Sequence, residues 1–239
     1  MSAVASCPAV RATSADLPRP GSRAVLGGAI GSLGPAVLAA LHRDHPQRVF
    51  IAVAESPRDA VGIEADLETL FDGFEQSHLY PQKEALPYEE AEPHLEVGGL
   101  RVEAVEALFS GRARILVTTP RALQERVPIP TRLTDLRTTL GVGDHLVFSE
   151  LPDMLEKRGF ERVALVEEVG QFAVRGGILD VFSIATGDPV RIEFWGDEIV
   201  SIRSFDVLDQ RSTSELTETH VLPVDFLRGS EEEGAVIAR

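Results

Sequence analysis

Lysine is almost absent from this chain: Lys83 and Lys157 are the two lysines among 239 residues, and arginine supplies the rest of the positive charge. Positive charge as a whole is also scarce, with 23 Lys and Arg against 38 Asp and Glu, a net charge of -15. An acidic surface repels a phosphate backbone, whereas nucleic-acid binders usually carry a basic face. Nonspecific DNA binding is therefore not expected, although a local basic patch is compatible with this composition.

Cys7 is the single cysteine of the sequence, which excludes an internal disulfide framework and a zinc site made of cysteines. Residues 4–7 (VASC) superficially match a lipoprotein cleavage site, but they lack the charged and apolar regions of a signal peptide. No run of about 18 apolar residues is present, so no membrane span is expected. These absences favour a cytoplasmic chain.

The six histidines are scattered, and His42 and His45 form the single pair with metal-like spacing. Their expected place at the end of a helix favours an interaction with the helix dipole over a metal site. A Gly-x-Ser-x-Gly motif is also missing. We therefore expect no catalytic residues, no cofactor and no metal.

Residues 1–20 are rich in Ala, Ser and Pro and are expected to form a flexible lead-in without a core pattern. After them, short apolar runs alternate with helical patterns, which predicts an α/β domain whose parallel sheet is covered on both faces. Ser56 is the expected N-cap of one helix. The expected strands lie at 48–54, 78–81 and 113–119, and the expected helices at 35–42, 58–71, 100–110 and 121–126. Between them, residues 82–98 form an acidic loop to which no role is assigned (Glu84, Glu89, Glu90, Glu92 and Glu96).

The pattern changes after about residue 137, where a period of two predicts an α+β domain with an antiparallel sheet. The expected elements are a helix at 153–158 and strands at 171–182, 190–195 and 198–205. Gly196-Asp197 between two alternating runs indicates a hairpin.

Alternation along 190–195 assigns the residues of this strand to two faces. Val190, Ile192 and Phe194 should point into the core, and Arg191, Glu193 and Trp195 away from it (VRIEFW). Arg and Trp are enriched at the centres of protein interfaces, so the second face is a candidate binding surface. Two plainer alternatives stay open: Trp195 at the edge of the core, and Arg191 in a solvated ion pair with Glu193.

Three segments carry a family resemblance: YPQKEALPYEEAEPH at 80–94, VTTPRALQERV at 117–127, and FAVRGGILDVF with VRIEFWGDEIVSIRSFD and Gln210-Arg211-Ser212. In order and spacing they resemble the amino-terminal part of the bacterial transcription-repair coupling factors (Mfd), and more distantly UvrB. The resemblance covers roughly residues 22–228.

The resemblance implies a division into domains. Residues 21–137 would form a nucleotide-binding-like α/β domain (domain 1a) with a degenerate P-loop, and 138–222 an inserted α+β domain (domain 2). Residues 223–239 would begin domain 1b. The change of periodicity near residue 137 agrees with this division.

The strand–loop–helix expected at 25–41 contains the glycines of the degenerate P-loop, which are Gly27, Gly28, Gly31 and Gly34. A phosphate-binding loop needs a lysine that reaches the phosphates, and the nearest lysine in the sequence is Lys83. We therefore expect no ATP hydrolysis here. The alternative structural role is a glycine-rich turn that packs a helix close to its strand.

The resemblance also implies a partner, because domain 2 docks the repair protein UvrA in both families. Carried over residue by residue, the family's UvrA-binding positions are Arg175, Arg191 and Trp195, and Gly176-Gly177 would form a bulge that redirects Arg175. The implied function is recruitment of UvrA to stalled RNA polymerase, with polymerase and DNA bound by downstream domains. The competing hypotheses are a UvrB-like helicase fragment and a direct DNA-binding module.

Overall fold

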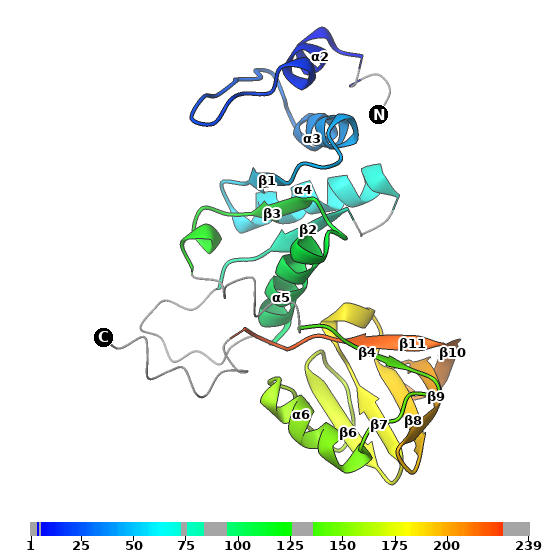
Figure 1. Ribbon diagram of the computed structural model, residues 1–239. Helices are drawn as coiled ribbons and strands as arrows, with labels where there is room; N and C mark the ends of the chain where they lie inside the picture. Colours follow the sequence, from blue (N-terminus) through cyan, green and yellow to red (C-terminus); the bar gives the residue numbers. More distant parts are fainter. Residues whose placement is uncertain (1–3, 5, 73–75, 84–94, 126–135, 227–239) are drawn as a thin grey trace. The chain divides into compact units, whose positions relative to one another are not determined.

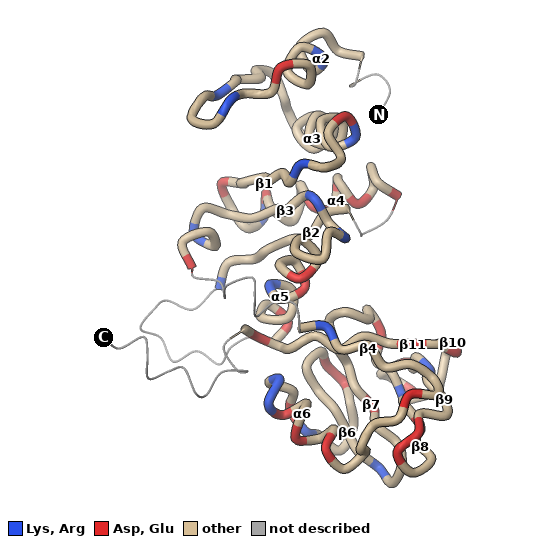
Figure 2. The backbone as a smooth tube through the Cα atoms, in the orientation of Figure 1, with Lys and Arg blue, Asp and Glu red and all other residues tan. Residues whose placement is uncertain are grey.

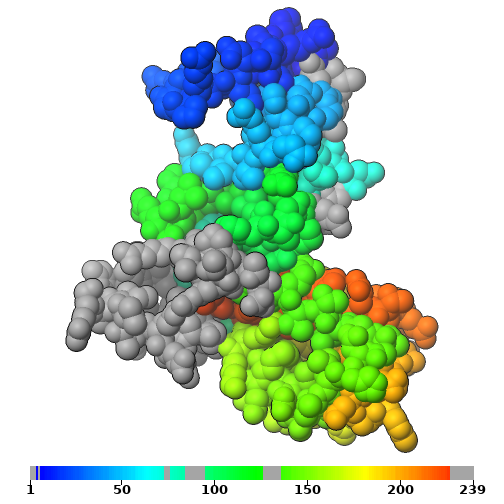
Figure 3. Space-filling model, in the orientation of Figure 1, coloured from blue at the N-terminus to red at the C-terminus, as the bar shows by residue number. Residues whose placement is uncertain are grey.

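The computed structural model describes residue 4 and residues 6–72, 76–83, 95–125 and 136–226. The chain divides into two compact units: residues 1–82 with 107–126, and residues 83–106 with 127–239. Figures 1 and 3 show the units as ribbons and as space-filling surfaces, coloured along the sequence.

The described part of the first unit contains a three-stranded parallel sheet in the order β1-β3-β2. Phe50 and Ser77 both pair with Ile115 of the central strand. The strands are β1 (Phe50–Val53), β2 (Ser77–Tyr80) and β3 (Ile115–Thr118), and the helices are α2 (Pro8–Ala15), α3 (Leu33–Asp44) and α4 (Pro57–Phe71), with a 3-10 turn at Ala122–Gln124. The predicted parallel sheet is confirmed, and the helix expected at 121–126 is corrected to this single turn.

Helix α4 begins where the sequence predicts. The Ser56 hydroxyl accepts a hydrogen bond of 3.2 Å from the Asp59 amide, and Pro57 occupies the first helical position. Such a cap satisfies an amide that has no partner within the helix. The helix then buries Ala60 and Leu67 in a core with Ile115 and the other inward residues of the sheet.

The three strands are buried to different degrees. All four residues of β3 are buried, whereas Ile51 and Val53 of β1 are 54% and 50% exposed. The expectation of a buried strand at 48–54 is therefore wrong for one face. β1 lies at one edge of the sheet and β3 in its centre, but β2, at the other edge, has no exposed residue, so the exposed face is particular to β1.

The beginning of the chain contains more order than its composition suggests. Helix α2 packs against α3, and Ser14 donates a hydrogen bond of 2.8 Å to Asp44. Val10 is 5% exposed. The expectation that this stretch has no core pattern is wrong for residues 8–15.

The described part of the second unit contains a six-stranded sheet in the order β10-β9-β8-β7-β6-β5 and a two-stranded sheet of β4 and β11. Neighbouring strands are antiparallel except β5 and β6. The strands are β4 (Thr138–Gly141), β5 (Glu161–Arg162), β6 (Gln171–Arg175), β7 (Ile178–Val181), β8 (Val190–Trp195), β9 (Glu198–Phe205), β10 (Ser212–Leu216) and β11 (Glu218–Val221). The helical elements are α5 (Leu95–Ser110), of which residues 95–106 belong to this unit, α6 (Leu151–Lys157), and 3-10 turns at Phe148–Glu150 and Ile184–Thr186. The predicted antiparallel sheet is confirmed.

One face of the six-stranded sheet is the core of this unit. Val190, Ile192 and Phe194 of β8 are buried there, together with Leu151 and Leu155 of α6, which lies against the sheet in Figure 1. The predicted inward face of β8 is thereby confirmed. We call the opposite face the outer face of the sheet.

The strand expected at 171–182 is two strands. Arg175 pairs with Ile178, so Gly176-Gly177 forms the two-residue turn of a hairpin, with φ of +61° at Gly176. The expected bulge at this glycine pair is therefore wrong. Glycine adopts the left-handed conformation without the cost that a Cβ imposes, which favours a tight turn here.

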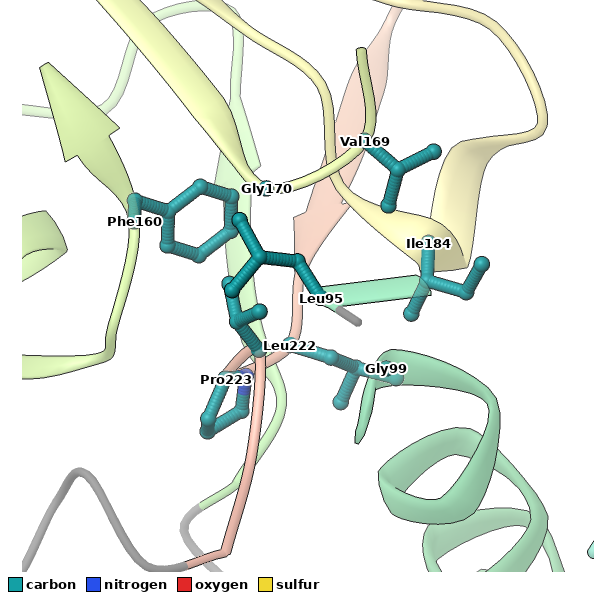
Figure 4. Close-up of a pocket in the computed structure, with 9 residues that line it drawn as sticks. Leu95, Gly99, Phe160, Val169, Gly170, Ile184, Leu222 and Pro223 are labelled. Carbon is teal, nitrogen blue, oxygen red and sulfur yellow. The ribbon is translucent and has the colours of Figure 1, made fainter. Parts of the chain in front are cut away.

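The start of α5 packs closely against Ile184 and Val224 of the same unit. A Cβ at Gly98 would overlap the carbonyl oxygen of Val224, and a Cβ at Gly99 would lie 3.1 Å from Cβ of Ile184. Figure 4 shows Leu95 directed between Phe160 and the chain at Leu222. The two glycines allow the helix to approach at backbone distance.

Candidate partner-binding surface

A buried carboxylate brings two of the three expected binding residues together. Asp180 of β7 has 0% exposure. Its Oδ1 accepts a hydrogen bond of 2.7 Å from Arg191 Nε, and its Oδ2 accepts one of 2.9 Å from Arg191 Nη2. Arg175 also donates to Oδ2 through Nη2. The three residues come from adjacent strands, because Asp180 pairs with Arg191 and Arg175 lies on β6.

Arg191 is held on several sides. Its third donor group, Nη1, lies 3.2 Å from the carbonyl oxygen of Gln210, and its guanidinium lies 4.8 Å from the centre of the Phe205 ring. Its side chain is 17% exposed. The hydrogen bonds to Asp180 hold the pKa of Arg191 above its ordinary value.

The solvated pair of Arg191 with Glu193 is not what the structure contains. Glu193 pairs with Arg203 of β9, at 3.2 Å, while Arg191 turns to Asp180. A buried carboxylate satisfied by a bidentate guanidinium is a stronger arrangement than an exposed pair. Arg191 is therefore part of a built cluster.

Arg175 is the more accessible arginine of this cluster. It is the last residue of β6, immediately before the Gly176 turn, and 47% of its side chain is exposed. Its guanidinium pairs with the buried carboxylate of Asp180. A positive charge is thus held at the surface of an otherwise acidic chain.

The side chain of Trp195 is exposed to solvent. It is 81% exposed at the end of β8, paired with Glu198 across the hairpin, and Gly196 in the turn has φ of +63°. The alternative of a tryptophan at the edge of the core is therefore wrong. Trp195 shares the outer face with Arg191, four residues or ~13 Å along the strand, and Figure 2 shows acidic and basic positions interleaved on β8 and β9.

Sequence reasoning missed Asp180, Phe205 and the Gln210 carbonyl. The signal for Asp180 was an acidic residue inside an apolar run, Ile178–Val181. A buried carboxylate needs compensating hydrogen-bond donors, and the two nearby arginines, Arg175 and Arg191, were already predicted as binding residues. Gln210 could not have been found this way, because its backbone and not its side chain binds Arg191.

The glycine-rich segment has a different form from the one expected. Residues 22–26 form no strand, and Val25 is 82% exposed. Gly27, Gly28 and Gly31 lie in the loop, and Gly34 lies in α3. A Cβ at any of these four glycines would meet nothing within 4 Å. The alternative of a turn that packs a helix close to its strand is therefore wrong for the described residues.

The two histidines with metal-like spacing have separate partners. His42 Nε2 lies 2.8 Å from Gln76 Oε1, and His45 Nε2 lies 2.8 Å from the carbonyl oxygen of Ser14. Within the described ranges no three His, Cys, Asp or Glu side chains form a group that could hold a metal ion. The same residues contain no helix of the length and apolarity needed to span a membrane. Of the acidic loop, residues 84–94 lie outside the described part, and Glu96 lies in the first turn of α5.

Comparison with known proteins defines the class of the second unit. Residues 138–226 match the family model of the UvrB interaction domain. The match spans β4 to β11 and includes the Asp180 cluster and Trp195.

Transcription-repair-coupling factors are similar to a larger part of the chain. The Myxococcus xanthus protein is 37% identical over 213 residues, which cover 86% of this chain and 18% of that protein. The Mycobacterium tuberculosis protein is 36% identical over 78% of this chain and 15% of its own length, and the Haemophilus influenzae protein is 31% identical over 87% and 18%. The chain therefore contains a segment that matches the UvrB interaction domain and is, over most of its length, similar to the transcription-repair-coupling factors. It spans less than a fifth of the length of these relatives.

Proposed function

We propose that this chain recruits UvrA through the outer face of the six-stranded sheet, with Arg175, Arg191 and Trp195 as the binding residues. The observation that carries the proposal is the 81% exposed Trp195 on the same face as the arginine cluster, inside the match to the UvrB interaction domain. An exposed tryptophan on the same face as a fixed cation is typical of an interface centre. Arg191 would contribute mainly by shaping the surface, since it is largely enclosed.

The wider role that we propose follows the relatives. Residues 138–222 would be domain 2, inserted between a degenerate nucleotide-binding domain 1a at 21–137 and the start of domain 1b at 223–239. The protein that contains them would link stalled RNA polymerase to nucleotide excision repair, with its polymerase-binding and DNA-translocating parts outside this chain. The similarity to transcription-repair-coupling factors supports this role.

ATP hydrolysis forms no part of the function that we propose for this region. The degenerate loop at Gly27–Gly34 has no lysine, and the two lysines of the chain are Lys83 and Lys157. Without that cation a triphosphate would lack its main charge partner. Measurable ATP turnover by the purified chain would favour the helicase hypothesis, and tight, salt-sensitive binding to duplex DNA would favour the DNA-binding one.

The experiment that tests UvrA recruitment is a titration of the purified chain with purified UvrA. Trp195→Ala should weaken binding by about 2 kcal/mol or more, since truncating an interface anchor has this effect. The matched control is Ile30→Ala, which removes an apolar side chain of similar exposure, 84%, from the first unit. Equal binding by wild type and Trp195→Ala would contradict the site.

A further inference from the structure

Asp180 is the centre of a three-charge cluster on β6, β7 and β8. Both of its oxygens accept hydrogen bonds from Arg191, and Oδ2 is shared with Arg175. A buried carboxylate is unfavourable unless charge-assisted hydrogen bonds compensate for the lost water. Here the two arginines supply them, so neither guanidinium is placed independently of Asp180.

The balance of charge in this cluster is positive. Among these three side chains one carboxylate faces two guanidiniums, a net charge of +1, and Glu193 adds a further favourable electrostatic interaction with Arg191. This charge is open to solvent mainly on one side, because the Arg175 side chain is 47% exposed and that of Arg191 is 17% exposed. Arg175 is therefore the part of the cluster that a partner can reach.

Arg191 provides the rigid side of the cluster. Asp180 and the Gln210 carbonyl occupy its donor groups, and the Phe205 ring lies 4.8 Å from its guanidinium. Arg175 has no such enclosure, since it ends β6 beside the Gly176 turn. Its orientation therefore depends on the fixed carboxylate more than on packing.

We infer that Asp180 is a positioning residue of the partner-binding surface: it orients Arg191 and holds Arg175 where a carboxylate of the partner can bind it. The inference rests on the proposed function and deepens it, because it names the chemistry expected on UvrA opposite Arg175, an acidic group. Without Asp180, two like charges would lie side by side, and Arg175 would turn into solvent. Binding would then have to restore an orientation that is now present before the partner arrives.

Two substitutions of Asp180 separate positioning by charge from simple packing. Asp180→Asn keeps the size and removes the charge, whereas Asp180→Glu keeps the charge and adds a methylene to a fully buried site. If Asp180 acts by packing, the Asn variant should bind UvrA better than the Glu variant. If it positions the arginines, the Glu variant should bind better.

The measurement is the dissociation constant for purified UvrA with the full chain, by calorimetry or fluorescence anisotropy. We expect Asp180→Asn to weaken binding by about tenfold or more, because binding must then order the side chains of Arg175 and Arg191, and Asp180→Glu to weaken it less. The matched control is Asp153→Asn, the same change of charge in α6 on the opposite face of the sheet, which should bind as wild type does. Asp180→Asn within twofold of wild type, or tighter than Asp180→Glu, would overturn the inference.

A second variant covers the case in which Asp180→Asn does not fold, as judged by circular dichroism. Arg191→Lys keeps the positive charge but cannot bridge both Asp180 oxygens and the Gln210 carbonyl at once. Positioning predicts a loss of UvrA binding close to that of Arg191→Ala. Wild-type affinity in Arg191→Lys would overturn the inference.

The Trp195→Ala variant distinguishes failure of the inference from failure of the proposed function. If Trp195→Ala loses binding and Asp180→Asn keeps it, the surface is correct and the role of Asp180 is wrong. If the wild-type chain does not bind UvrA, both are wrong.

Discussion

The Ser77 hydroxyl donates a hydrogen bond of 3.1 Å to Oε1 of Glu64, where the first residue of β2 meets α4. The other carboxyl oxygen of Glu64 is buried without a hydrogen-bond partner in the described structure. Burial raises the pKa of Glu64 to about 7, against the opposing effect of the Ser77 hydrogen bond, and Glu68 adds to the increase. The first unit therefore contains a carboxyl group that is protonated well above its ordinary range.

This pKa predicts that the stability of the first unit depends on pH. Between about pH 4.5 and 7 the folded chain holds a proton on Glu64 that the unfolded chain has released, so stability falls as the pH rises through this window. Glu64→Gln, which stays neutral, should reduce the fall. Thermal unfolding of the wild-type and Glu64→Gln chains from pH 4.5 to 8 measures this change in stability. An equal fall of stability with pH in both chains would show that Glu64 is ionised in the folded chain.

Gly98 and Gly62 predict opposite effects of the same substitution. A Cβ at Gly98 would overlap the Val224 carbonyl, so Gly98→Ala should destabilise the second unit by roughly 1–3 kcal/mol. Gly62 lies in α4, and a Cβ added there would meet nothing within 4 Å. Gly62→Ala should therefore stabilise the first unit by roughly 0.5–1 kcal/mol, because alanine loses less backbone entropy in a helix. Denaturant titration of each variant measures both. A Gly98→Ala variant as stable as wild type would contradict the close packing of α5.

The N-caps of α4 and α3 form a second matched pair. Ser56→Ala removes the hydroxyl that accepts the Asp59 amide, and it should cost about 1 kcal/mol. Ser32 precedes α3 without a side-chain cap, so Ser32→Ala should change stability by less than ~0.5 kcal/mol. Urea unfolding compares the two variants, and similar losses in both would contradict the capping role of Ser56.

Phe194 and Trp195 are neighbours in β8 whose substitution by alanine should have different effects on stability and on UvrA binding. Phe194 is 7% exposed in the core, so Phe194→Ala should cost about 3 to 5 kcal/mol of stability. Trp195 is 81% exposed, so Trp195→Ala should leave stability within ~0.5 kcal/mol while it weakens UvrA binding. Thermal unfolding beside the UvrA titration tests the pair. A large loss of stability in Trp195→Ala would assign this residue to the core instead of the surface.

Local pattern was sufficient for much of the second unit. Strict alternation over 190–195 predicted both faces of β8, because successive side chains of a strand point to opposite sides whatever surrounds it. The bounds of β8 and β9 agree with their predicted ranges, since Gly196-Asp197 is a strong hairpin signal. The resemblance selected Arg175, Arg191 and Trp195, and their role in binding stays a prediction.

The sequence by itself determined the two kinds of sheet, the capped helix α4, the hairpin at Gly196 and the lack of a phosphate-binding lysine, because each depends on residues close together in the chain. Tertiary structure alone decided what depends on distant residues. It turned Arg191 away from Glu193 toward Asp180, placed the Gln210 carbonyl beside it and made β1 an edge strand. The physical reason is that a buried charge selects its partner by compensation across strands, and sequence spacing does not record which strands become neighbours.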